Sequence, residues 1–137
     1  MSGYSYKIEM LTMDIASLQS AIELAKDQRA DLLDIRNELM DEKRELESQE
    51  SFINEPETDN ESSHGTHAEA HEDERETARQ LHEKAVERVE EMIQAVNDER
   101  DDLASQIQTD RAKVYDREDR ISMLKQKQRA AQEAASR

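Results

Sequence analysis

Residues 67–135 lie in the longest stretch of the sequence that contains no Gly and no Pro. Apolar residues recur through it at alternating spacings of three and four, which is the heptad pattern of a helix that packs lengthwise on other helices. As one continuous helix of about 70 residues it would be about 100 Å long, which is too long for an ordinary globular domain. The sequence therefore predicts a coiled coil. The heptad seam comprises Val86, Val89, Ile93, Val96, Arg100, Leu103, Ile107, Asp110, Val114, Arg117, Ile121 and Leu124.

A second heptad pattern precedes this stretch and predicts another helix over residues 4–50. Its first half carries only apolar residues in the seam, whereas its second half places Arg29, Arg36 and Lys43 there. A cation at a seam position either extends to solvent or meets a carboxylate across the interface. This seam comprises Ile8, Leu11, Ile15, Leu18, Ile22, Ala25, Arg29, Leu32, Arg36, Leu39, Lys43 and Leu46.

Residues 51–65 interrupt the helical pattern with an acidic polar connector that contains Pro56 and Gly65. We predict an all-α fold, a long antiparallel two-helix coiled-coil hairpin folded at this connector and completed by a partner chain. Because the first helix is shorter, the second helix (residues 66–135) is expected to overhang it from about Lys113 onward. An extended rod that dimerises in parallel would satisfy the same heptads.

The second helix opens with a capping box formed by Thr66 and Glu69. Its first turns carry a separate seam, which is expected to shift register by one residue just before Val86. That seam comprises His67, His71, Glu74, Ala78, Leu81 and Ala85.

The composition excludes several classes of function. A net charge of −15 disfavours nucleic acid as a ligand. No apolar run approaches the length of a membrane span, and the absence of Cys removes thiol chemistry. The chain lacks a signal-peptide pattern at its N-terminus. We expect a protein made soluble in the cytoplasm, without membrane insertion or a cofactor, whose export would need a route without a cleaved leader.

The sequence offers little that could carry chemistry. Its many carboxylates have no predicted pocket that would perturb their pKa values, so an enzyme is not expected. We predict no metal site and interpret His67, His71 and Glu74 as polar seam positions without a ligand. Two other interpretations remain: a zinc ion, which suits two His side chains four residues apart with a Glu one turn further on, or a site whose charge changes between pH 5 and 7.5.

Three residues give the chain a resemblance to a known family. Gly65 precedes the second helix, and Tyr115 with Asp119 forms a Tyr-x-x-x-acid pair on one helix face. The chain resembles the WXG-type proteins of type VII secretion and the small helical partners of LXG toxins. In that family the glycine marks the turn and the Tyr-x-x-x-acid pair is the export signal. The position of the family's Trp holds Ser63.

The resemblance implies a non-enzymatic adaptor or targeting chaperone that binds the helical region of a larger secreted toxin. Two alternatives are a self-assembling structural coiled-coil scaffold or spacer and a holdase-like chaperone hairpin. Each predicts a hetero- or homo-oligomer held by helix packing. The residues expected to bind the partner are Ile8, Leu11, Ile15, Leu18, Ile22, Leu103, Ile107, Val114, Ile121 and Leu124.

Overall fold

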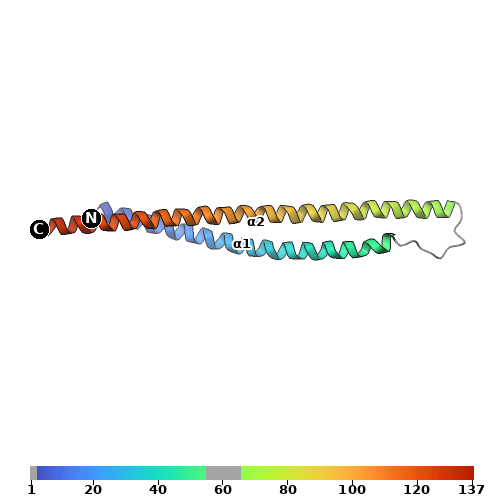
Figure 1. The fold of residues 1–137 in the computed structure, drawn as a ribbon, viewed down its shortest axis with the longest axis horizontal. Helices are drawn as coiled ribbons and strands as arrows, with labels where there is room; N and C mark the ends of the chain where they lie inside the picture. The colour runs from blue at the N-terminus through green and yellow to red at the C-terminus, as the bar shows by residue number, and fades with distance from the viewer. Residues whose placement is uncertain (1–2, 55–65) are drawn as a thin grey trace. The chain divides into compact units, whose positions relative to one another are not determined.

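The computed structural model describes residues 3–54 and 66–137, with side chains described for residues 3–50 and 71–137. It contains two helices, α1 (Gly3–Asn54) and α2 (Thr66–Ala135), and the described residues include no β-strand (Figure 1). The predicted all-α class is confirmed. α1 runs four residues past the predicted end at residue 50, and most of the predicted connector, with Gly65, lies outside the described residues.

Both helices follow from the local sequence. After Gly3, no Gly or Pro occurs before Pro56, and none occurs within α2, so nothing interrupts the backbone hydrogen bonds of either helix. α1 ends two residues before Pro56, consistent with the bias that proline imposes on the residue before it. Exposed acid-to-base pairs three residues apart, such as Glu23 with Lys26 and Asp41 with Arg44, add small local support.

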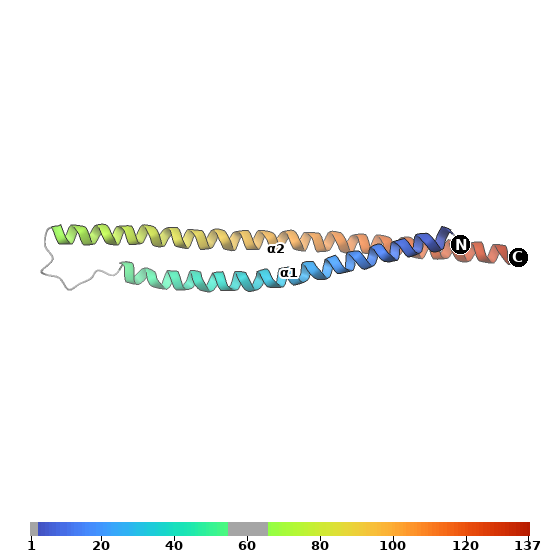
Figure 2. The same cartoon turned by 180° about the vertical axis from the view of Figure 1, so that it is seen from behind.

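Contacts divide the chain into two units, each built from a part of α1 and a part of α2. Unit 1 comprises Met1–Asp31 and Arg100–Arg137, and unit 2 comprises Leu32–Glu99. Within each unit the two helices lie side by side and run antiparallel, as the two opposite views agree (Figure 2). The predicted two-helix hairpin is therefore confirmed in each unit.

Unit 1 holds most of the buried apolar side chains. Its residues with an exposed fraction below a tenth include the apolar set Ile22, Ala25, Leu103, Ile107 and Val114. A two-helix pair buries only one stripe per helix, so the residues that flank this set remain partly buried. Burial of these aliphatic side chains against one another is the main stabilising term in the unit.

Unit 2 has a thinner apolar core. Only Leu39 and Val89 are buried among its described side chains. Lys43 lies in the seam and reaches Glu90 on α2 at 3.4 Å, which is the carboxylate across the interface that a seam cation requires. His82 of α2 contacts the backbone carbonyl oxygen of Leu46 through its Nε2.

The overhang predicted from Lys113 is wrong in its starting point. Arg117 of α2 lies 3.7 Å from Asp14 of α1, and Gln128 donates a hydrogen bond to Ser5 at 2.9 Å. α1 therefore covers α2 as far as Gln128, and only the last turns of α2 extend past it (Figure 1).

The axial register of α2 against α1 places the apolar stretches of the two helices opposite each other. The predicted overhang assumed that the two ends of the connector lie together, which would leave Val114, Ile121 and Leu124 uncovered. In the observed register these residues face the apolar half of α1, which removes more apolar surface from water. Within unit 2, α2 consequently begins beyond the end of α1 (Figure 2).

The predicted change of register before Val86 is also wrong. Leu81 is 63% exposed, and His71 and Glu74 are exposed as well. The partly buried positions instead run through Arg75, Ala78, Arg79, His82 and Ala85, which continues the main seam toward the start of α2. Ala78 and Ala85 lie at the edge of this seam in either register. One uninterrupted register avoids the local distortion that a one-residue shift imposes on a coiled coil.

Candidate interaction surface

The residues predicted to bind a partner form the internal seam of unit 1. Ile22, Leu103, Ile107 and Val114 are buried between α1 and α2. The other six are partly buried, so another chain can reach only their outer edges. They are Ile8, Leu11, Ile15, Leu18, Ile121 and Leu124. A partner must therefore contact positions that flank the seam.

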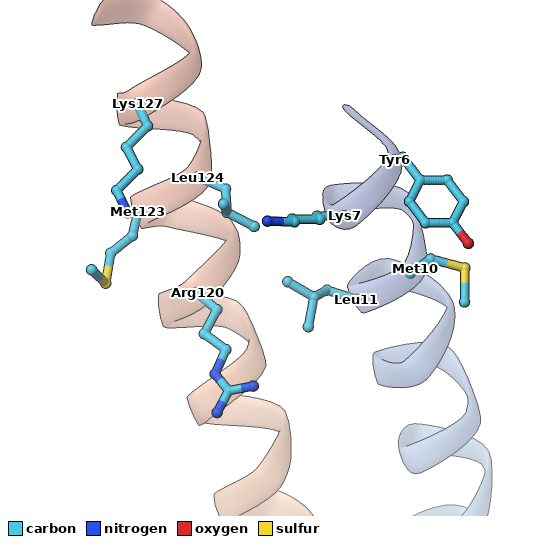
Figure 3. A pocket seen from close by; sticks show the side chains of 8 residues that line it. All are labelled: Tyr6, Lys7, Met10, Leu11, Arg120, Met123, Leu124 and Lys127. Carbon is cyan, nitrogen blue, oxygen red and sulfur yellow. The ribbon is translucent and has the colours of Figure 1, made fainter. Parts of the chain in front are cut away.

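One such position is an open groove between the two helices of unit 1, with a volume of about 410 Å³. Its apolar lining consists of Tyr6, Met10 and Leu11 from α1 and Met123 and Leu124 from α2. Leu11 and Leu124 point toward each other between the helices, with Tyr6 and Met10 on the α1 side and Met123 on the α2 side (Figure 3). The floor of the groove is thus the edge of the seam, and its walls are exposed apolar side chains.

Three cations complete this groove: Lys7 from α1, and Arg120 and Lys127 from α2. Arg120 also pairs with Asp116 on its own helix, with Nε and Oδ2 3.2 Å apart. Both members of that pair are more than half exposed, so its contribution to stability is small. The groove therefore combines an apolar floor with basic side chains.

A second, smaller groove lies on the other side of the seam in unit 1. Tyr115 lines it together with Gln19, Glu23 and Lys26 of α1. Tyr115 is 66% exposed, and Asp119, one turn further on, is exposed too. The Tyr-x-x-x-acid pair is therefore presented on the outside of α2, alongside α1 instead of on an overhang.

The seam of both units contains polar groups at positions that the heptad spacing predicts. In unit 1, Arg29 donates from Nε to the backbone carbonyl oxygen of Arg100 at 3.1 Å, and Asp110 is only 8% exposed. The Nε atoms of Arg36 and Arg100 are buried without a hydrogen-bond partner among the described residues. Leaving such a group unpaired costs stability, so the polar seam is weaker than the apolar one.

The predicted histidine cluster is not assembled into a site by the described residues. His71 and Glu74 are both exposed on α2, and the side chain of His67 lies outside the described set. Over residues 3–50 and 71–137, no group of three or more His, Cys, Asp or Glu side chains is placed to hold a metal ion. Neither α1 nor α2, as far as each is described, contains a segment long and apolar enough to cross a membrane.

Comparisons with known proteins found no family model, no curated protein and no solved structure that matches the chain.

Sequence reasoning missed the outward-facing residues because it followed only the main seam. A second stripe on α1 with the same alternating spacing carries Tyr6, Met10, Met13 and Leu24, all more than two fifths exposed, with two serines between Met13 and Leu24. From residue 27 to residue 45 the same positions hold only acids, namely Asp27, Asp31, Asp34, Glu38, Asp41 and Glu45. A search for a second heptad stripe would have found this surface.

Proposed function

We propose that this chain is a non-enzymatic helical interaction protein that acts as the small partner of a larger secreted LXG-type toxin in type VII secretion. The observation that carries the interaction part is the exposed apolar stripe of α1 in unit 1. Tyr6, Met10 and Met13 lie in solvent on an otherwise strongly charged chain. Contiguous exposed apolar side chains of this kind mark surfaces that another protein covers.

The export part of the proposal is supported by Tyr115 and Asp119. They are four residues apart on one face of α2, and both are exposed, so a second protein can contact ring and carboxylate together. In this role the helix pair holds Tyr115 and Asp119 in a fixed position on one face. The larger partner would be exported together with this chain because it is bound to unit 1.

Self-assembly into a scaffold is the main rival. It has weaker support at the groove, because a second copy placed there symmetrically would bring Lys7, Arg120 and Lys127 against the same cations. Like charges placed opposite each other disfavour association. A homo-oligomer would need a different face.

The test starts with purification of the tagged chain from its native cells. We expect a larger protein with a long helical N-terminal region to co-elute at a stoichiometric level. Secretion of both proteins is then compared for the native chain, Tyr115→Ala and Tyr115→Phe. We expect Tyr115→Ala to abolish secretion without dissociating the complex, whereas Tyr115→Phe, which keeps the ring, retains it. Equal secretion of all three would remove the export role and leave the interaction role standing.

A further inference from the structure

The groove of Tyr6, Met10, Leu11, Met123 and Leu124 is too exposed to be explained by the hairpin alone. Tyr6 is 63%, Met10 44% and Met123 57% exposed. These side chains come from both helices and line one groove. Tyr6 and Met10 lie along the α1 side of it and Met123 along the α2 side (Figure 3). Methionine is flexible and packs well against varied apolar partners, which suits it to a docking surface.

The basic side chains around the groove follow a pattern. Lys113, Arg120 and Lys127 are spaced at seven-residue intervals along α2, and all three are exposed. They form a basic ridge that flanks the seam on the groove side, and Lys7 of α1 lines the groove with Arg120 and Lys127. In coiled coils the residues that flank the seam select the partner by charge.

The two observations together identify the occupant. We propose that this groove binds a single amphipathic α-helix of another protein, whose apolar stripe is flanked by Asp and Glu side chains. The apolar stripe would pack on Met10, Leu11 and Leu124, and the flanking acids would pair with the ridge and with Lys7. The proposal rests on the proposed function only for the claim that the chain binds another helical protein.

The overall negative charge of the chain would by itself favour the opposite kind of ligand. With a net charge of −15, non-specific attraction would favour a basic ligand and repel an acidic one. A preference for an acidic helix can therefore arise only from local positive charge. Arg120 must exchange its intrahelical partner Asp116 for the ligand, which costs little because the pair is exposed.

The experiment uses two synthetic helical peptides of equal length with leucine at the seam positions. One carries glutamate at the flanking positions and the other lysine. Binding of each labelled peptide to the full chain is measured by fluorescence anisotropy at low and at high salt. We expect the glutamate peptide to bind about tenfold more tightly at low salt, and the preference to shrink at high salt.

Charge reversal tests the groove itself. The triple variant Lys7→Glu, Arg120→Glu, Lys127→Glu is expected to invert the preference between the two peptides. A matched triple variant, Lys26→Glu, Arg111→Glu, Lys125→Glu, changes the net charge equally but lies outside this groove, and is expected to keep the native preference.

Two substitutions of exposed methionines by glutamate test the apolar lining of the groove. Met10→Glu is expected to lose glutamate-peptide binding at least about tenfold, because it places an acid where the ligand's apolar stripe packs. Met92→Glu is the control, since Met92 is similarly exposed but lies in unit 2 and does not line the groove. Unchanged helicity by circular dichroism is expected for both, since both residues are exposed.

Several results would overturn the proposal. These are tighter binding of the lysine peptide by the native chain, no binding of either peptide, or equal effects of the two triple variants. A dimer of the chain alone that Met10→Glu dissociates would make a second copy the occupant. If a helical partner from native cells stays bound to the Met10→Glu variant, the proposed function stands while the groove assignment fails.

Discussion

Units 1 and 2 are built from the same two helices, yet they divide apolar and charged residues in opposite ways. In unit 1 the seam is mainly aliphatic, and Tyr6, Met10 and Met13 are exposed on the outside. In unit 2 the seam admits Arg36 and Lys43, and the outward positions of α1 are acidic. The difference indicates that unit 1 gathers exposed apolar side chains along one stripe of α1, whereas the same stripe is acidic in unit 2 and its exposed apolar residues Ile35, Leu81 and Met92 lie elsewhere.

The largest expected effect is the difference in unfolding free energy lost when a residue of the aliphatic seam or a residue on the surface is replaced by alanine. Ile107→Ala removes a 6% exposed side chain from unit 1 and is expected to cost about 3 kcal/mol of unfolding free energy. Denaturant unfolding followed by circular dichroism measures this. Leu24→Ala, at a 59% exposed position of unit 1, is the control and is expected to change little. Similar losses in both variants would show that unit 1 has no distinct core.

The second prediction concerns a substitution that makes the seam of unit 2 more apolar, like that of unit 1. Arg36→Leu replaces a seam guanidinium whose Nε is buried without a described partner, and we expect a gain of about 1–2 kcal/mol in unfolding free energy. Hydrogen exchange should slow in unit 2. Arg44→Leu, which removes an exposed pair with Asp41, is the matched control without such a gain. A loss of stability in Arg36→Leu would mean that the cation is well satisfied.

A smaller effect concerns Asp110, the buried acid in the seam of unit 1. Asp110→Leu is expected to add about 1 kcal/mol of stability, while making the pairing of the helices less specific. Because the chain has no Cys, a pair introduced by Ser5→Cys and Gln128→Cys reports the native register by disulfide formation. We expect that yield to fall in Asp110→Leu. An unchanged yield would show that apolar matching alone sets the register.

The smallest effect belongs to the ion pairs of unit 2. Lys43 contacts Glu90 at 3.4 Å and Glu47 at 3.7 Å, and both carboxylates are about half exposed. Lys43→Ala is expected to cost about 0.5 kcal/mol, an amount that salt should reduce. Unfolding at low and at high salt checks it. A cost near that of Ile107→Ala would contradict the view that charge contributes little to holding this unit.

The sequence predicts the faces of the helices better than their axial offset. The spacing from Ile8 to Leu46 identifies the buried face of α1 because side-chain direction repeats with the helix turn. The offset between the helices depends on long-range matching of apolar stretches, and a long connector leaves it open. For this reason the overhang was misplaced, whereas the residues that pack were identified.

The candidate site was only partly predictable, for a related reason. Tyr115 and Asp119 were found because four-residue spacing places two side chains on one face whatever the helix packs against. The groove could not be found, because it joins Met10 to Met123 across the hairpin and appears only once the register is known. Leu81 shows the same limit, since a leucine at plausible spacing proved to be exposed.

The most direct test of the account is side-chain oxidation footprinting of the tagged chain as purified from its native cells. Met10 and Met123 line the groove of unit 1, and Met92 is a comparably exposed methionine in unit 2. The account predicts slower oxidation of Met10 and Met123 in the purified complex than in the isolated chain, with Met92 unchanged. Protection of Met92 in place of the groove methionines, or recovery of the chain alone, would contradict it.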